Sequence, residues 1–313
     1  SIVDFLSLFS YSYTKCCTEE KTMTIAYWMM KLISIFPNFR GKGRIFNLFK
    51  RQYLKSGSPI VKVKGELGEL KIDLRSFEWI YFCTKCYDSD LMKSAFSDLD
   101  VNEVSVDVGA NIGFWTMAIA QHIKKMGGIG KVFAFEAHPR NYERLVENIH
   151  LNGLSDYISA HNIALSDSNG TLQLVCREDF ESGAITGNAS ISVGNEFDKS
   201  FSTISVEATT ADDLFSLLNI KRVGFVKIDI EGHEDFFFRG AERTLRDSRP
   251  TVLMEVNIPF YKARGVNNIL DVFNSIFQGY LFYNGDKSNT DLHKLVSSDI
   301  ENIIAKPISS GKV

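Results

Sequence analysis

Residues 103–113 read Glu-Val-Ser-Val-Asp-Val-Gly-Ala-Asn-Ile-Gly, and this stretch decides the fold. Its first half is a β-branched run, which is typical of a buried parallel strand. Two glycines and an asparagine follow, and residues 114–124 then place apolar side chains at helical spacing. A strand, a glycine-bearing turn and a helix form the first unit of a doubly wound α/β sheet, whose ligands bind at the carboxyl ends of the strands.

The spacing of the glycines distinguishes between two kinds of cofactor. The turn reads Gly109-x-x-x-Gly113 with Asp107 just before it, instead of the Gly-x-Gly-x-x-Gly of dinucleotide-binding turns. A dinucleotide needs bare backbone amides to hold its pyrophosphate. An acidic residue here suits a cationic ligand without phosphate, such as S-adenosylmethionine with its sulfonium and ammonium groups. A turn that serves only tight packing is the alternative.

A second strand is predicted at residues 132–135, and it ends at Glu136, 23 residues after Gly113. An acidic side chain at this place can accept hydrogen bonds from both hydroxyls of a ribose. Asp107 and Glu136 together therefore predict a cofactor of the nucleoside type. An NAD-dependent dehydrogenase is the less favoured alternative, because the third glycine is missing and Asp107 is present.

A second group of charged residues follows the strand predicted near residue 225. Residues 225–234 read Phe-Val-Lys-Ile-Asp-Ile-Glu-Gly-His-Glu, which crowds three carboxylates into six positions. Crowded carboxylates have raised pKa values, and such a group can act as general base toward a hydroxyl. We therefore predict catalytic roles for Asp229, Glu231, His233 and Glu234. Capping of the following helix is the alternative for Glu231, His233 and Glu234.

A third strand is predicted at residues 157–164, and a later one at residues 251–256 carries Glu255 to the same edge as Asp229. Asp229, Glu255 and Asn257 offer the oxygen ligands that Mg²⁺ prefers, which is a minor alternative. No spacing rule requires it, so no metal site is predicted. Residues 83–86 form a single Cys-x-x-Cys motif, and no second Cys-x-x-Cys pair or spaced histidines accompany it to complete a zinc site.

The basic residues of the chain are unevenly distributed. Its 313 residues allow one large α/β domain with an extension, and a formal net charge of −3 argues against a dedicated nucleic-acid-binding protein. Residues 31–64 nevertheless contain nine Lys or Arg and no Asp or Glu. This segment is interpreted either as a basic amphipathic element for an anionic membrane surface or substrate, or as a helical cap with solvated charges.

The remaining stretches predict the organisation of the chain. No stretch has the roughly 20 apolar residues of a bilayer span, and residues 1–22 lack the basic start of a signal peptide. A cytoplasmic protein is predicted, with peripheral contact to the inner membrane face left open. Residues 59–75 predict a hairpin and residues 177–202 a loop over the site. An N-terminal extension, residues 1–100, is expected to precede a cofactor-binding domain, residues 101–313.

Four segments resemble the FkbM-type family of class I S-adenosylmethionine-dependent methyltransferases. They are VDVGANIGFWT at 106–116, FAFEAHPRNYERLVENIHLNG at 133–153, IALSDSNGTLQL at 163–174 and VKIDIEGHEDFFFRGAERTLRDSRPTVLMEVN at 226–257. The resemblance implies a Rossmann-like seven-stranded sheet with helices on both faces. It also implies transfer of a methyl group to a hydroxyl of a sugar, a glycolipid precursor or a similar metabolite, and an anionic or lipid-linked acceptor would suit the basic segment. A non-catalytic S-adenosylmethionine-binding module is the alternative.

The resemblance also implies roles for individual residues. Glu136 would bind the ribose, Asp229 would lie beside the methyl group, and Glu231 with Gly232 would shape the acceptor side. The predicted cofactor-binding residues are Asp107, Gly109, Ala110, Asn111, Gly113, Glu136, Ala137, His138, Ser166, Asp167 and Asp229. Among them His138, Ser166 and Asp167 would lie near the adenine. Tyr87-Asp88 departs from relatives, which tend to carry an aromatic residue followed by Glu, so its role in closing the site is open.

Overall fold

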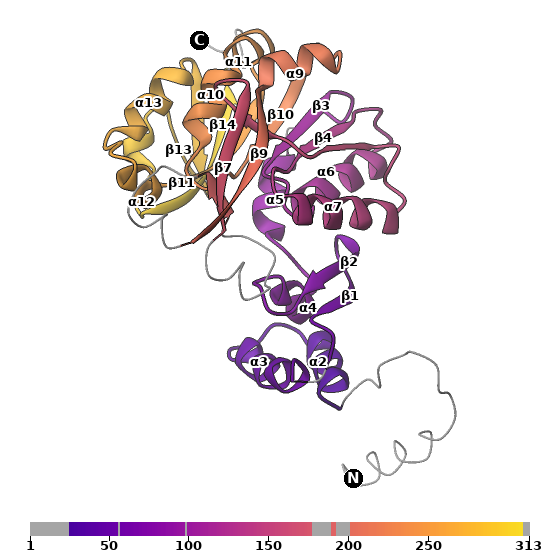
Figure 1. The fold of residues 1–313 in the computed structure, drawn as a ribbon. Helices are drawn as coiled ribbons and strands as arrows, with labels where there is room; N and C mark the ends of the chain where they lie inside the picture. Colours follow the sequence, from indigo (N-terminus) through magenta and orange to yellow (C-terminus); the bar gives the residue numbers. More distant parts are fainter. Residues whose placement is uncertain (1–24, 56, 98, 177–188, 192–200, 309–313) are drawn as a thin grey trace. The chain divides into compact units, whose positions relative to one another are not determined.

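The computed structural model describes residues 25–55, 57–97, 99–176, 189–191 and 201–308 (Figure 1). The chain divides into two compact units, Ser1–Pro59 and Ile60–Val313, and each is described by itself. The predicted domain boundary between residues 100 and 101 stays a prediction. The loop predicted at residues 177–202 lies outside the described residues, except for 189–191, 201 and 202.

The described part of the smaller unit consists of two helices, α2 (Ile25–Ile35) and α3 (Lys42–Tyr53), which pack against each other. Lys42 belongs to the basic segment but is buried. Its ammonium donates hydrogen bonds to the carbonyl oxygens of Phe36, at 2.6 Å, and Ser34, at 3.5 Å. Lys42 therefore closes the carboxyl end of α2, as basic side chains often do.

The main sheet of the larger unit has the strand order β13–β12–β14–β11–β10–β3–β4–β5. Its strands are β3 (Val104–Val108), β4 (Val132–Phe135), β5 (Ile158–His161), β10 (Val223–Ile228), β11 (Thr251–Asn257), β12 (Tyr280–Asn284), β13 (Lys287–Asn289) and β14 (Ile300–Pro307). The neighbouring strands β11, β10, β3, β4 and β5 pair in parallel. The strands β14, β12 and β13 each pair antiparallel with their neighbours. The predicted α/β fold is confirmed. The described sheet has eight strands instead of the predicted seven, because β13 forms a hairpin with β12.

Helices connect the parallel strands and cover the sheet (Figure 1). They include α6 (Phe114–Lys125), α7 (Pro139–Leu151), α10 (Glu234–Gly240) and α11 (Glu242–Ser248), with α9 (Ala211–Leu217), α12 (Ile258–Ala263), α13 (Ile269–Ile276) and η2 (Leu292–Lys294) nearby. Crossovers between parallel strands are right-handed, so α6 and α7 lie on the face opposite α10 and α11. The strand order reverses between β3 and β10, and open α/β sheets bind ligands at such a point.

A second sheet of the larger unit has the order β6–β9–β7–β8, formed by β6 (Ala164–Ser166), β9 (Ser202–Thr210), β7 (Gly170–Cys176) and β8 (Ala189–Ile191). The prediction of a single strand at residues 157–164 is wrong, because β5 ends at His161 and β6 belongs to this other sheet. Asn162 lies at the break, and its amide donates to the carbonyl oxygens of Glu136 and Ala137 at 2.8 and 3.0 Å.

The segment before β3 contains β1 (Ile60–Gly65), β2 (Gly68–Asp73), α4 (Trp79–Thr84) and α5 (Ser89–Phe96). β1 and β2 pair antiparallel, which confirms the predicted hairpin. Buried apolar side chains from β3, β10 and β11, among them Val106, Val226 and Met254, join α10 and α13 in one core. None of the described helices is long and apolar enough to cross a membrane.

Candidate active site

A cavity of about 410 Å³ lies at the carboxyl ends of β3, β4, β10 and β11. The predicted site residues in its wall are Gly109, Ala110, Asn111, Glu136, Ala137, Asp229, Glu231 and His233. The wall also contains Tyr87 and Glu255, whose roles the sequence analysis left open, and residues that it did not consider for the site, among them Phe77, Phe114, Asn141 and Lys227. One cavity therefore collects the glycine turn, the acidic end of β4 and the carboxylates after β10.

The glycine turn is fixed by its own backbone contacts. Gly109 has a φ angle of +78°, and a Cβ atom there would collide with the carbonyl oxygen of Asp229. The amides of Gly109 and Ala110 both donate to the carbonyl oxygen of Phe135 at 3.0 Å. Glycine is therefore required at position 109 by the close packing of this turn against the loop that follows β10.

Glu136 presents a buried carboxylate to one end of the cavity. It accepts hydrogen bonds from the amides of Asn111, at 2.8 Å, and His138, at 2.9 Å. Burial raises the pKa of Glu136 to about 7, although these bonds and one from the Asn141 side chain oppose the rise. A carboxylate has about four acceptor sites, so these three bonds leave one site for a further donor. Asn141 is also buried, and its Oδ1 atom has no hydrogen-bond partner among the described residues.

Replacing Glu136 by glutamine is expected to change how stability depends on pH. A carboxyl whose pKa rises on folding stabilises the folded state at low pH, and this contribution is lost as the pH rises from about 4.5 to about 7. The Glu136→Gln variant should therefore gain stability relative to the wild type over this range, by up to about 3 kcal/mol. Urea unfolding of both proteins at several pH values would measure the difference.

The stability of the variant must be compared with that of the wild type at each pH, because buried histidines change the stability of both proteins with pH in the opposite direction. Burial lowers the pKa values of His138 and His233 to about 4, so their contribution to stability is lost as the pH falls from about 6.5 to 4. The exposed Glu143, on the same helix α7, provides the matched control Glu143→Gln. A pH-independent difference between wild type and Glu136→Gln would contradict the prediction.

Lys227 connects the glycine-turn strand to the acidic residues. Its ammonium lies 3.3 Å from Oδ2 of Asp229 and 3.8 Å from Oδ1 of Asp107. Asp107 is fully buried and accepts a hydrogen bond from Thr116 at 2.5 Å, so it supports the cavity from behind the wall. Burial alone would lower the pKa of Lys227, but the two carboxylates raise it. Lys227 is thus an ammonium held between two carboxylates.

Three carboxylates meet at the other end of the cavity. Oxygen atoms of Asp229, Glu231 and Glu255 lie within 4.8 Å of one another. Burial, followed by the charges of Asp229 and Glu234, raises the pKa of Glu255 to about 7. A carboxylate with such a pKa can exchange a proton near neutral pH. The magnesium alternative from the sequence combined Asp229 and Glu255 with Asn257. In the structure the third residue of the group is Glu231.

Two of the predicted catalytic residues make contacts typical of structural roles. His233 lies in the wall but is buried, and its Nε2 atom shares a hydrogen bond with Ser166 Oγ at 2.9 Å. Glu234 is buried outside the wall, where it accepts bonds from the amides of Ile230 and Gly232 and from the Tyr261 hydroxyl. These contacts fix the loop after β10, whose amides lie before α10, so they are not the helix-capping bonds of the alternative.

Several predicted cofactor-binding residues also lie outside the wall. His138 caps α7, because its Nδ1 atom accepts from the amide of Arg140 at 3.2 Å. Asp167 forms an ion pair with Arg239 at 3.3 Å, and the Ser166 hydroxyl is engaged with His233. Gly113 likewise does not contribute to the wall. The roles predicted for these residues near the cofactor stay predictions.

Aromatic side chains form a further part of the wall. The rings of Tyr87 and Phe114 stack with centroids 4.1 Å apart, and Phe77 lies 6.4 Å from Phe114. Burial raises the pKa of Tyr87, so its hydroxyl stays protonated. Asp88 is held by a hydrogen bond with the side chain of Trp115, another wall residue. The sequence offered no signal for these contacts, because Phe77 and Tyr87 lie far from Phe114 along the chain.

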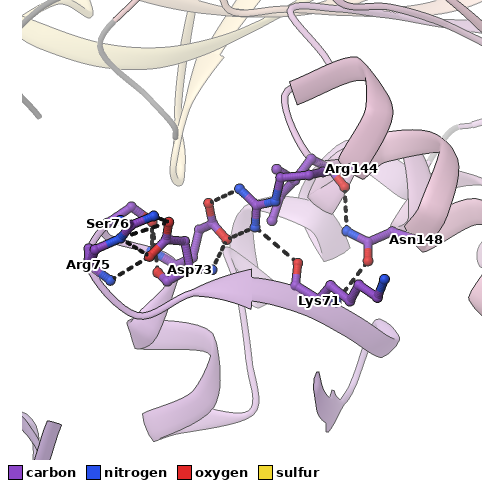
Figure 2. A network of polar contacts seen from close by, with 8 residues as sticks. Lys71, Asp73, Arg75, Ser76, Arg144 and Asn148 are labelled. Atoms are coloured by element: carbon purple, nitrogen blue, oxygen red, sulfur yellow. Dashed lines mark hydrogen bonds and ion pairs between the residues drawn. The ribbon is translucent and has the colours of Figure 1, made fainter. Parts of the chain in front are cut away.

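A network of polar contacts attaches the hairpin to α7 (Figure 2). Arg144 donates two hydrogen bonds to Glu78, at 2.9 and 2.5 Å, and a third to the carbonyl oxygen of Lys71. Asn148 accepts from the amide of Lys71 at 2.8 Å and donates to the carbonyl oxygen of Ile112 at 2.9 Å. Since Ile112 belongs to the glycine turn, the network holds the hairpin, α7 and this turn together.

The protein is an α/β protein with a mixed sheet, and its cavity lies at the switch point of the parallel strands, where open α/β sheets bind ligands. Within that class, the chain belongs to the FkbM methyltransferase family, because residues 107–282 match the family described as "Methyltransferase FkbM domain". The resemblance stated from the sequence is thereby confirmed.

Individual relatives match over part of their length. The chain is 28% identical to the hexuronic acid methyltransferase AglP of Haloferax volcanii over 170 residues, which are 54% of this chain and 62% of that protein. It is 30% identical to methyltransferase sdnD of Sordaria araneosa over 152 residues, 48% of this chain and 49% of that protein. A crystal structure of methyltransferase FkbM from Methylobacillus flagellatus KT aligns with 66% of this chain and 43% of its own, at 17% identity and a TM-score of 0.41.

Proposed function

We propose that the protein transfers the methyl group of S-adenosylmethionine to a hydroxyl oxygen of a sugar or a similar small metabolite. The observation that carries this proposal is the division of the cavity into two ends. Glu136 offers a hydrogen-bond acceptor at the end of β4, and the carboxylates Asp229, Glu231 and Glu255 lie toward β10 and β11, on the other side of β3.

The end of the cavity around Glu136 fits a nucleoside. The Glu136 carboxylate keeps an acceptor site for a ribose hydroxyl, and it lies in the wall of the cavity. Apolar wall residues, among them Phe135, Ile163 and Leu165, offer a surface for a base. The carboxylate of Asp229 and the stacked rings of Tyr87 and Phe114 provide partners for a cationic sulfonium group.

The end around Glu255 fits a general base. When bound, the cofactor supplies a methyl group on a sulfonium, so transfer breaks a carbon–sulfur bond and forms a carbon–oxygen bond. Glu255 would accept the proton of the acceptor hydroxyl, because its carboxylate has a pKa of about 7. The Lys227 ammonium lies 3.3 Å from Oδ2 of Asp229, and this ion pair fixes the position of the Asp229 carboxylate.

The charge of the cavity bears on the acceptor. Four wall residues, Glu136, Asp229, Glu231 and Glu255, are acidic, whereas Lys227 is the basic wall residue that offsets them. A reacting hydroxyl on an uncharged part of the acceptor therefore suits this end of the cavity. A sugar acceptor is supported by the relative described as a hexuronic acid methyltransferase. An anionic or lipid-linked group on the same acceptor would have to lie away from the reacting hydroxyl.

Calorimetric titration with S-adenosylmethionine, S-adenosylhomocysteine and NAD tests the cofactor. The first two should bind, and Glu136→Ala should weaken their binding about 100-fold, because charge-assisted hydrogen bonds are lost. The exposed Glu143→Gln variant should bind like the wild type. Glu255→Gln should keep cofactor affinity but lose about 100-fold in transfer to sugar acceptors, measured by mass spectrometry. Folded protein that binds NAD instead, or binds none of the three, would contradict the proposal.

A further inference from the structure

Helix α2 carries two apolar stripes on opposite sides. One stripe is buried and contains Ala26, Tyr27, Met30 and Ile33. The other, which we call the outer stripe, consists of Ile25, Trp28, Leu32 and Ile35, with exposed fractions of 78%, 45%, 41% and 73%. With 3.6 residues per turn, these four positions share one side of the helix. A helix that packs on one side needs only one apolar stripe, so the outer stripe calls for a separate explanation.

Exposed apolar side chains continue beyond α2. Phe36 and Phe39 lie between α2 and α3, and Ile45 and Leu48 lie on α3. Eight of the 15 large apolar side chains that are exposed in the described chain thus fall within residues 25–48. Such a concentration marks an interaction surface, whereas single exposed apolar residues are ordinary.

The charge around this surface has one sign. Residues 25–59 contain seven of the 35 Lys and Arg residues of the chain and none of its 38 Asp and Glu residues. Two of the seven, Lys42 and Lys50, are buried. The exposed ones are Lys31, Arg40, Arg44, Arg51 and Lys55. A second copy of this unit would bring the same positive charge, and like charges oppose association.

Lys31 and Trp28 show how charge and apolar surface meet. The Lys31 ammonium lies 5.4 Å from the centroid of the Trp28 ring and 5.1 Å from that of Tyr27. A basic side chain that keeps its charge at the edge of an apolar stripe is typical of helices at a membrane–water interface. Tryptophan is also enriched at that interface.

We propose that the unit formed by α2 and α3 binds the surface of a membrane that contains anionic lipids. The outer stripe lies in the boundary between headgroups and acyl chains, and the exposed Lys and Arg residues contact lipid phosphates. The described part of α2 has 11 residues and is about 16 Å long, too short to cross a bilayer, so we place it in the plane of the membrane. This binding does not depend on the proposed methyl transfer.

Flotation of the full chain with lipid vesicles tests this proposal. The protein should float with phosphatidylcholine vesicles that contain phosphatidylglycerol, and remain unbound with phosphatidylcholine alone. The double variant Trp28→Gln/Leu32→Gln should lower partitioning at least tenfold, because apolar area is no longer buried. Arg40→Gln/Arg44→Gln should lower it about tenfold and weaken its dependence on salt.

Matched controls come from the larger unit. Ile129 and Leu217 are 82% and 76% exposed, so Ile129→Gln/Leu217→Gln removes at least as much exposed apolar surface elsewhere. Lys125→Gln/Lys287→Gln removes two exposed charges there. Both controls should float like the wild type. Three results would overturn the proposal: no flotation of the wild type, equal loss in a control, or a dimer in light scattering that the Trp28/Leu32 variant converts to monomer.

Discussion

Replacing Gly109 by alanine should lower the free energy of unfolding by about 2–5 kcal/mol. Two costs add at this position. The φ angle of +78° disfavours any residue with a side chain, and the new Cβ would collide with the carbonyl oxygen of Asp229. A backbone carbonyl cannot rotate away as a side chain does, so the turn or the loop after β10 must move. Urea unfolding of the variant would measure the loss.

Gly127→Ala is the matched control for this change. Gly127 has a similar φ angle of +70°, but a Cβ there would meet no atom within 4 Å. The control should therefore lose only the cost of the backbone conformation, about 1–2 kcal/mol. Equal losses in the two variants would mean that the contact between the glycine turn and Asp229 is not tight.

Replacing Arg144 by methionine should cost about 3–5 kcal/mol, because it leaves a buried carboxylate without its partner. The Glu78 side chain is fully buried and the Arg144 side chain is 9% exposed. Glu78 would retain the bond from the amide of Asp73 at 2.6 Å, and the opposite charge left near it would be that of Arg75, which pairs directly with Asp73. Chemical unfolding again provides the measurement.

Two further variants distinguish the contribution of the Glu78–Arg144 ion pair to stability from that of neighbouring contacts. Glu78→Gln combined with Arg144→Met should be more stable than Arg144→Met alone, because a neutral amide costs less to bury. Glu147→Gln removes the pair that Lys71 forms with the same helix at 3.1 Å, where both side chains are at least one-third exposed. It should cost no more than about 1 kcal/mol. A larger loss in Glu147→Gln than in Arg144→Met would refute the assignment of the buried pair.

Local sequence patterns were sufficient to predict those features of the fold and the site that depend on a single strand or helix. The strand at residues 132–135, the helix that starts at Pro139 and the convergence of Asp229 with Glu255 at one sheet edge were all predicted, since strand ends and helix starts have local signals. Lys227 could have been added by the same reasoning. It lies two positions before Asp229, and alternate residues of a strand share a face.

Contacts between distant segments could not be predicted in this way. The stacking of Tyr87 on Phe114 and the pairing of β9 with β6 depend on the tertiary fold. Glu234 was predicted to be catalytic because its charge adds to the local cluster. The backbone of Glu231 turns with a φ angle of +54°, however, and the amides on either side of it donate to Glu234. A left-handed residue other than glycine has no dependable sequence signal.

The aromatic side chains Phe77 and Tyr87 come from a part of the chain that precedes the family match at residues 107–282. The cavity is therefore assembled from two segments, one before the family match and one within it. An exchange of residues 60–100 between relatives would reshape one wall and leave Glu136, Asp229 and Glu255 in place. Such a graft would have to retain Glu78, since the buried Arg144 of α7 belongs to the recipient.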